Sequence, residues 1–275
     1  MISVAIPGGS RKEILAVVKQ AKAIYKDDVK FLVFDEEKNI NVNDLWEYWP
    51  CTSEEDSVKN AVQSIVDGHA QVLMKGMVQT RTMLKEVLVK ENGLRDKNVL
   101  SHVALVNLPQ YERNILLTDA AMNITPTTEQ LIQIVENAIQ VAYRTGISQP
   151  KIALLSSAEK YNPKMPSSVL AKEVMDHFTD RNDAIIYGPI SLDLAISKEA
   201  AEHKRFDAPI KGDADILVVP TIDVGNTLYK AFTIIGDAVI GGVIVGAKIP
   251  IVLTSRSDDN ESKLFALDFA IQQVR

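Results

Sequence analysis

The sequence predicts an α/β protein in which buried strands alternate with helices. Short, continuous apolar runs such as KFLVFD at 30–35 and KIALLSS at 151–157 have the composition of strands buried on both faces. Longer segments with apolar residues at helical spacing lie between such runs, for example at 11–26 and 131–146. This alternation favours βαβ units and mainly parallel sheets that helices cover on both faces.

Length and charge restrict the functional classes. The 275 residues can form one large or two medium domains. The formal charge of −6 gives no general attraction for nucleic acid or anionic membranes. The N-terminal sequence lacks the pattern of a signal peptide, and no apolar run reaches the roughly 18 residues of a membrane span. We therefore expect a cytoplasmic protein that binds neither nucleic acid nor membrane.

The remaining elements follow the same alternation. Further strands are predicted at 3–7, 72–76, 99–109, 114–119, 184–191, 214–220 and 249–254. Further helices are predicted at 54–68 after Ser53 as N-cap, and at 79–93, 166–178, 192–204 and 261–274. Residues 36–50 are polar and look irregular. The helix at 131–146 can begin from Thr125 with Pro126 or from a capping box of Thr127 with Gln130.

The character of the chain changes near residue 125, where we place a domain boundary. The last predicted helix has a mostly apolar pattern and is expected to pack back on the first domain. The predicted domains are therefore 1–125 with 245–275, and 126–244.

Common nucleotide and metal motifs are missing from the sequence. Neither G-x-G-x-x-G after the first strand nor a P-loop is found, and the four histidines are not at metal-ligand spacing. The single cysteine, Cys51, excludes an internal disulfide and is more typical of a buried thiol than of a nucleophile. We expect no metal and no cofactor.

Polar residues follow the buried run IPIVLT at 249–254. Arg256 can bind phosphate or carboxylate oxygens in two places, and Ser255 can donate a hydrogen bond to the same anion. A helix that begins around Asp258 would point its N-terminal amides at that anion. Alternatively, Ser255 only caps the last helix and Arg256 is a surface charge.

Other predicted strand ends carry similar residues. Asp223 and Gly225 form a turn into a short helix on which Asn226 and Lys230 share a face, although a plain strand-to-helix connection explains them equally well. The other polar strand-end residues are Lys75, Gly76, Thr118, Asp119 and Asn123. Ligands bind at the carboxyl ends of strands in open α/β sheets. The glycines at 238–247 favour a tight turn and close strand packing over phosphate binding.

Four separated motifs, in order, resemble the phosphate acyltransferase family of phosphate acetyltransferases and phosphate butyryltransferases. They are LTDAAMN with TPTTEQL, GPISLDLAIS, GDADILVVPTIDVGNTLYK and IPIVLTSRS. The length and LMKGMVQT resemble the butyryl-type branch, which handles short straight or branched acyl groups. The family implies two α/β domains with an interdomain cleft, similar to the isocitrate and isopropylmalate dehydrogenases, and a homodimer or higher homo-oligomer.

The resemblance implies that acyl-CoA and phosphate are converted reversibly to acyl phosphate and CoA, with both substrates bound together and no acyl-enzyme. CoA is a substrate. Ser255 and Arg256 match the family's Ser-Arg pair at the reacting carbonyl and phosphate. Asn226 and Lys230 match positions that line the phosphate and acyl pocket. Asp223, which we expect in the same pocket, stands where the acetyl-type enzymes often have asparagine.

The remaining site residues are predicted from the same resemblance and from their positions near the ends of predicted strands. We expect Thr118, Asn123 and Lys75 in the phosphate and acyl pocket. Gly76, Thr80 and Arg81 are expected to contact CoA, with Lys85 as a further cation for its nucleotide part.

The sequence departs from the family at the expected catalytic base. Acetyl-type members have an aspartate seven residues after the serine, and this chain has Ser262 there. Asp258 or Asp259 replaces that base, or no residue does, because a free thiol is already a few per cent ionised at pH 7. Two other functions stay open: a metal- and nicotinamide-dependent decarboxylating dehydrogenase of the same architecture, and a catalytically weakened acyl-CoA-binding protein.

Overall fold

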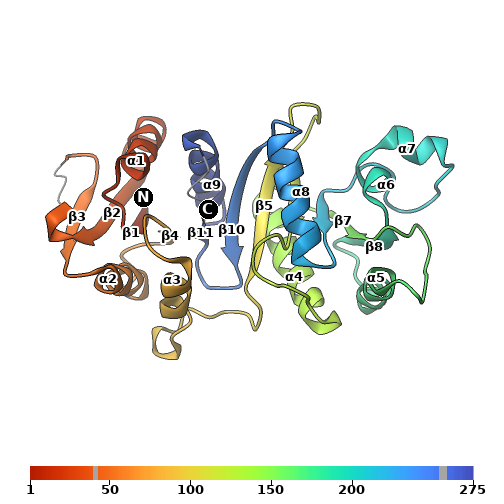
Figure 1. The fold of residues 1–275 in the computed structure, drawn as a ribbon, viewed down its shortest axis with the longest axis horizontal. Coiled ribbons are helices and arrows are strands. Elements are labelled where there is room, and N and C mark those ends of the chain that lie inside the picture. Colours follow the sequence, from red (N-terminus) through yellow and green to blue (C-terminus); the bar gives the residue numbers. More distant parts are fainter. Residues whose placement is uncertain (40–42, 254–258, 275) are drawn as a thin grey trace. The chain divides into compact units, whose positions relative to one another are not determined.

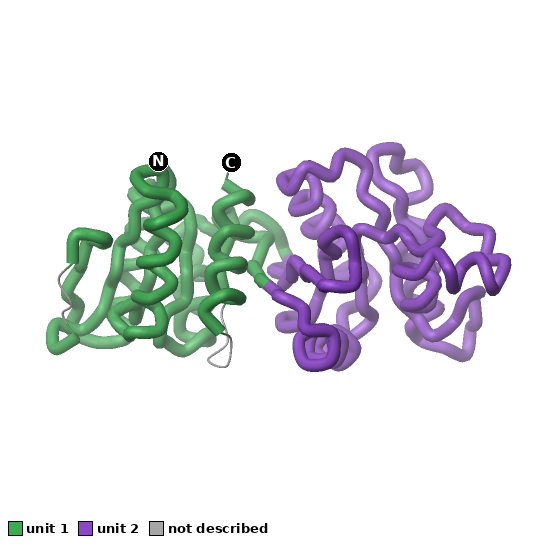
Figure 2. Tube along the Cα trace, turned by 90° about the horizontal axis from the view of Figure 1, so that it is seen from above, with its two compact units in different colours: residues 1–98, 241–275 green, residues 99–240 purple. Residues whose placement is uncertain are grey.

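A computed structural model describes residues 1–39, 43–253 and 259–274. The chain groups into two compact units, one formed by 1–98 with 241–275 and the other by 99–240 (Figure 2). The boundaries expected from the sequence, near residues 125 and 245, remain a prediction of the domain limits. No helix in the described part of the chain is both long and apolar enough to span a membrane.

The strands of the first unit are ordered β3-β2-β1-β4-β11-β10. Their bounds are β1 Ile2–Pro7, β2 Val29–Glu36, β3 Glu47–Cys51, β4 Val72–Met74, β10 Val239–Val245 and β11 Ile251–Val252. All neighbours are parallel except β10 and β11, which are antiparallel. Strand β10 occupies most of 238–247, where the sequence analysis predicted no strand and expected the glycines to form a tight turn.

The sequence analysis missed strand β3. The sequence that leads into it is mostly polar, and the strand includes Pro50, which lacks the amide hydrogen that an interior strand needs. The strand lies at the edge of the order, where proline is tolerated because one side has no neighbour. Its apolar signal is weak because only Cys51 is buried among its five residues.

Two pairs of helices cover these strands. Helices α1 (Lys12–Tyr25) and α9 (Asn260–Gln272) pack together on one side, and α2 (Glu54–Val66) and α3 (Thr80–Val87) on the other (Figure 1). Ser53 caps α2 as predicted, since its hydroxyl accepts from the Asp56 amide at 3.2 Å. The helix predicted at 79–93 divides into α3 and a short 3₁₀ turn, Lys90–Asn92, which Gly93 ends in a left-handed conformation.

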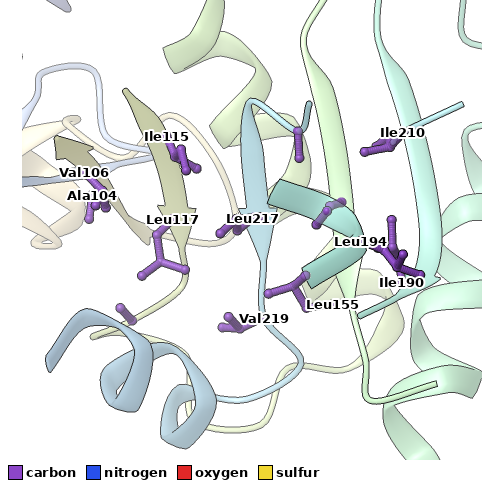
Figure 3. Packing of buried hydrophobic residues seen from close by; sticks show 14 of the residues in the cluster. Ala104, Val106, Ile115, Leu117, Leu155, Ile190, Leu194, Ile210, Leu217 and Val219 are labelled. Atoms are coloured by element: carbon purple, nitrogen blue, oxygen red, sulfur yellow. The ribbon is translucent and has the colours of Figure 1, made fainter. Parts of the chain in front are cut away.

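The second unit has strand order β5-β6-β9-β7-β8. The bounds are β5 Ser101–Asn107, β6 Ile115–Thr118, β7 Lys151–Leu155, β8 Ile185–Ile190 and β9 Ile216–Val218. Only the β5–β6 pair is antiparallel. Leu117, Leu217 and Leu155 from three strands share a buried cluster with Leu194 (Figure 3). This cluster forms the apolar core behind the strand ends.

The helices of the second unit are α4 Thr128–Arg144, α5 Pro166–His177, α6 Leu192–Ile196, α7 Lys198–His203 and α8 Ile222–Ile234. The capping box of Thr127 and Gln130 begins α4, so the second of the two predicted starts is right. The helix predicted at 192–204 divides at Ser197, whose hydroxyl caps α7.

Candidate functional site

In the first unit, the turn after β1 is in close contact with the end of β4. The amide of Gly76 donates to the carbonyl of Pro7 at 3.1 Å, and a Cβ at Gly76 would lie 2.4 Å from the carbonyl oxygen of Gly8. Gly8 itself has a φ of +63°. Only glycine fits position 76 without moving the backbone. This packing explains Gly76 structurally, and its contact with CoA remains a prediction.

Asp35, at the end of β2, orders the same turn and was not singled out by the sequence analysis. Its carboxylate accepts hydrogen bonds from the Ser10 hydroxyl at 2.6 Å and the Ser10 amide at 3.0 Å. Burial would raise the pKa of Asp35, but these bonds and those from Glu36 and Asn39 outweigh it and lower the pKa. The position of an aspartate directly after KFLVFD was the available signal.

Lys75 is a buried cation at the carboxyl end of β4. Lys75 is only 6% exposed, and its Nζ donates to the Gly76 carbonyl at 3.3 Å. Its amide donates to the Val252 carbonyl of β11 at 3.0 Å. The structure therefore places Lys75 beside the last residues of the strand that leads to Ser255 and Arg256.

Helix α3 carries the residues predicted to contact CoA. Thr80 is its first residue, and the exposed side chains of Arg81 and Lys85 follow at a spacing of four, which places them on one helix face. The N-cap residue, Gln79, makes no side-chain bond to the first turn. The two cations and the amides at the start of the helix can bind an anionic ligand.

In the second unit, Asp119 organises the turn after β6. This residue is 2% exposed, and its carboxylate accepts from four donors. They are the amides of His102 at 3.2 Å, Ala121 at 2.9 Å and Met122 at 2.9 Å, and the Asn123 side chain at 2.6 Å. Four donors compensate the burial of one carboxylate. The carboxylate fixes the course of the chain from residue 119 to 123.

The structure uses Thr118 and Asn123 for internal hydrogen bonds. The Thr118 hydroxyl is fully buried and donates to the His102 carbonyl at 2.9 Å. The amide nitrogen of Asn123 donates to both Asp119 and the Leu100 carbonyl, the latter at 2.9 Å. In this arrangement both side chains shape the strand end, and their contact with phosphate or the acyl group stays a prediction.

Helix α8 packs against this turn. The prediction that Asp223 and Gly225 form a turn is wrong. Asp223, Gly225 and Asn226 all lie inside the helix, and Thr221 is its N-cap residue. Gly225 is therefore not in an unusual backbone conformation. It is needed because a Cβ there would lie 2.5 Å from the carbonyl oxygen of Asp119. The close approach of α8 to the turn is something that the sequence pattern does not reveal.

Asn226 and Lys230 share a face of α8, as predicted from their spacing. The Asn226 amide approaches the Ala120 carbonyl at 3.5 Å, and Lys230 Nζ lies 5.9 Å from the ring centroid of Tyr229. Asp223, Asn226 and Lys230 are all exposed. The N-cap residue of α8, Thr221, makes no side-chain hydrogen bond to the first turn of the helix.

Three predicted catalytic residues, Ser255, Arg256 and Asp258, lie outside the described residues. Asp259 is described and is the N-cap of α9: its carboxylate accepts from the Ser262 amide at 2.7 Å. That bond lowers the pKa of Asp259. The alternative in which Ser255 caps the last helix is therefore wrong, because Asp259 fills that role.

Cys51 is buried at the end of β3, as expected for a structural thiol. Burial raises the pKa of the Cys51 thiol, which favours its neutral form near pH 7. Within 1–39, 43–253 and 259–274, no group of three or more His, Cys, Asp or Glu side chains is placed to hold a metal ion.

The fold defines a class of α/β proteins that includes phosphotransacylases and dehydrogenases. A phosphotransacetylase from Staphylococcus aureus has a TM-score of 0.78 at 22% identity over 99% of this chain and 94% of its own. A 4-hydroxythreonine-4-phosphate dehydrogenase from Klebsiella pneumoniae has a TM-score of 0.60 at 10% identity over 100% and 99%. At such identities the likeness concerns the fold alone, and it confirms the predicted fold class.

Sequence similarity identifies the family. The phosphate acetyl/butaryl transferase family matches residues 51–271, and the chain belongs to it. A "Probable phosphate butyryltransferase" of Bacillus subtilis (strain 168) is 39% identical over 98% of this chain and 92% of its own length. The solved branched-chain phosphotransacylase from Enterococcus faecalis V583 is 56% identical, with a TM-score of 0.97 over 100% of this chain and 99% of that one. The predictions of the family and of an acyltransferase are confirmed.

Proposed function

We propose that this protein interconverts a short-chain acyl-CoA and phosphate with acyl phosphate and CoA, and that its acyl group is butyryl or branched. The observation that carries the proposal is the full-length likeness to a branched-chain phosphotransacylase at 56% identity. The likeness to a phosphate butyryltransferase of Clostridium acetobutylicum, 41% identical over 76% of this chain and 70% of that protein, agrees with it.

In the direction of acyl phosphate synthesis, a phosphate oxygen attacks the thioester carbonyl carbon. The carbon–sulfur bond breaks, and CoA leaves as a thiolate that takes up a proton. In reverse, the thiolate attacks acyl phosphate and phosphate leaves. Neither direction requires a nucleophile from the protein. The protein's contribution is to hold two substrates together and to stabilise the negative charge on the carbonyl oxygen and phosphate.

The proposed roles of the residues follow from where they lie in each unit. Arg256 holds phosphate and Ser255 hydrogen-bonds the reacting group. Lys75 supports the proposal as a cation held beside β11, the strand that precedes them. In the second unit, Asn226 and Lys230 are exposed on α8 and are available to the phosphate or acyl group.

In this proposal the thiol proton goes to Asp258 or to no group of the protein. Asp259 is engaged as a helix cap, and Ser262 donates its amide to that cap. Asp258 remains the only one of the two aspartates proposed as a base. A thiol with a pKa near 8.5 ionises to a few per cent at pH 7, so a base helps but is not required.

We further propose a homodimer in the cytoplasm. Support for assembly comes from α8, which carries apolar side chains on its outer surface. The exposed fractions are 39% for Val224, 73% for Ile234 and 82% for Ile235, and nearby Ile124 is 70% exposed. Ile234 and Ile235 are neighbours at the C-terminal end of α8, and adjacent exposed apolar side chains are typical of an interaction surface.

One assay tests the proposed reaction. Release of free thiol from acetyl-CoA, butyryl-CoA and isobutyryl-CoA is followed with and without phosphate. We expect phosphate-dependent release that is faster with the two larger acyl groups. Thiol release that does not depend on phosphate, or binding without release, would refute the reaction. A clear preference for acetyl-CoA would refute only the acyl group.

A variant tests the phosphate-binding role. We expect Arg256→Ala to lower turnover by on the order of 10²-fold, the scale for losing one charge-stabilising donor. Arg144→Ala is the matched control, because Arg144 is an exposed arginine at the end of α4. A loss of less than about tenfold in the Arg256 variant would contradict the role.

A further inference from the structure

The first unit contains a cavity that none of the predicted site residues lines. Its volume is about 660 Å³, within the usual range for small-molecule sites. It lies between α2 and the strands β1, β2 and β3, which stand together in Figure 1. Its lining runs along the strands, from Lys30 and Glu47 near their starts to Cys51 at the end of β3. None of the substrate residues proposed above lines it, so this cavity is a separate feature.

The cavity arises because helix α2 presents polar side chains to the sheet edge. Asn60, Gln63, Ser64 and Asp67 recur at spacings of three and four, so they share one face of α2 or its end. They face the strand residues Leu32, Phe34 and Trp49 across the cavity. A helix in this position normally fills such a space with apolar side chains.

The strand side of the cavity is an aromatic platform. Phe34 and Trp49 occupy paired positions on β2 and β3, and their rings stack with centroids 5.8 Å apart. Phe34 is 2% exposed, whereas Trp49 is 46% exposed although it lines the cavity. Trp49 thus rests on a buried ring and leaves part of its own surface open. Such a surface accepts a planar ring by stacking.

The opposite wall of the cavity carries amide groups that can form hydrogen bonds with the edge of a stacked ring. The Asn60 side-chain nitrogen donates to Asp56 at 3.0 Å and to Cys51 Sγ at 3.6 Å. The Gln63 nitrogen donates to Asp67 at 2.8 Å. Each amide oxygen is a further acceptor. Amide groups opposite an aromatic platform match a ring whose edge carries hydrogen-bond donors and acceptors.

The formal charges that line the cavity balance one another. Lys30 forms an ion pair with Glu47 at 2.8 Å, so its positive charge is already compensated. Asp67 adds a negative charge to the lining, and the ammonium group of Met1 adds a positive one. The lining therefore has no excess of positive charge that would favour a phosphate group, and an uncharged ligand suits it.

We propose that this cavity binds an uncharged, planar heteroaromatic compound with a hydrogen-bonding edge, the class to which nucleobases and nucleosides belong. Its ring stacks on Trp49, and its edge meets the amides of Asn60 and Gln63. The site is distinct from the substrate site and does not depend on the proposed acyl transfer.

Calorimetric titration of the full-length protein with adenosine, guanosine, cytidine and uridine tests the proposal. We expect at least one nucleoside to bind and its 5′-monophosphate to bind no more tightly, because the lining has no excess of positive charge for the phosphate. We expect Trp49→Leu to weaken binding by about tenfold or more through the loss of stacking. Saturating CoA is expected to leave nucleoside binding unchanged.

A matched variant and two further outcomes complete the test. Tyr161→Leu removes another exposed aromatic side chain, one that does not line the cavity, and is expected to bind like the wild type. The fold of an Asn60→Leu variant is checked by circular dichroism. This variant is expected to lose more affinity for nucleosides than for benzene, a ring without hydrogen-bonding groups. Failure of all four nucleosides to bind would overturn the proposal. Tighter binding of the monophosphate than of the nucleoside would also overturn it. So would a Trp49→Leu protein that changes its oligomeric state and keeps its affinity for the nucleoside.

Discussion

At the scale of single residues, buried carboxylates hold the strand ends in shape. Asp35 and Asp119 each lie at the end of a buried strand. Asp35 accepts hydrogen bonds from the turn after β1, and Asp119 accepts them from the turn that follows it in sequence. Neither could be assigned from its sequence position alone, because an aspartate after a strand is equally a ligand group or a turn former. The donors decide the role, and only tertiary structure shows them.

Asp35 predicts a pH-dependent contribution to stability. Its pKa is lowered in the folded protein, so its contribution is present above the unfolded pKa, near 3.9, and is lost as pH falls through the lowered folded value. We expect Asp35→Asn to reduce the loss of stability between about pH 5 and the acid limit. The measurement is the free energy of unfolding by urea as a function of pH.

Asp27→Asn is the control for this experiment, since the Asp27 side chain is fully exposed to solvent. An Asp35→Asn protein whose stability falls with acid as steeply as the wild type would show that the hydrogen bonds from Ser10 do not favour the ionised form.

At the scale of elements, the approach of α8 to the turn after β6 depends on one glycine. A Cβ at Gly225 meets the Asp119 carbonyl oxygen and the Ala120 Cα, the latter at 2.9 Å. We expect Gly225→Ala to destabilise the protein by about 1–3 kcal/mol despite the better helix propensity of alanine. Urea unfolding measures the change. Thr227→Ala, an exposed position on the same helix, is the control, and equal stability of the two variants would contradict the packing argument.

The start of α9 separates a capping role from a catalytic one. We expect Asp259→Ala to cost about 0.5–2 kcal/mol, and Asp259→Asn much less, because asparagine is also a good N-cap. The lowered pKa of Asp259 means that its ionised form favours folding above its unfolded pKa, and that this contribution is lost in acid. Turnover of Asp259→Asn is expected to keep the wild-type pH profile. A shifted pH profile of turnover would indicate that Asp259 acts as the base.

At the scale of the whole molecule, the outer surface of α8 predicts self-association. Val224 and Ile234 are exposed on a helix in which only Gly225 is buried, and Ile235, its C-cap residue, is exposed as well. We expect a double substitution, Ile234→Asp with Ile235→Asp, to convert the assembled protein to monomers. Sedimentation equilibrium measures the mass.

The matched control is Leu88→Asp, which places a charge at another exposed apolar position, on the C-cap of α3. A wild-type protein that is already monomeric would contradict the proposed dimer. So would a doubly substituted protein that keeps its assembled mass, because two carboxylates cannot be buried in an apolar interface without partners.

Much of this architecture can be predicted from local sequence. The helical periodicity of α1, α2 and α4 and the apolar runs of β2, β7 and β9 show their structural types, because burial of one face or both leaves a pattern along the chain. The caps Ser53 and Thr127 follow from side chains within three residues of their partners. The ordered motifs also identify the family correctly.

Other features depend on residues that are far apart in sequence. Strand β3 was missed because its edge position permits polar residues and Pro50, and α8 was assigned too late a start because Gly225 looked like a turn residue. The reason for Gly225 is a carbonyl more than 100 residues earlier, and the cavity beside Trp49 exists because α2 faces β3 there. By itself the sequence determined the alternation of elements and the family, since these depend on neighbouring residues. Only the tertiary structure decided which polar side chains are engaged within the fold and which face solvent, because that depends on what the packed chain brings beside them.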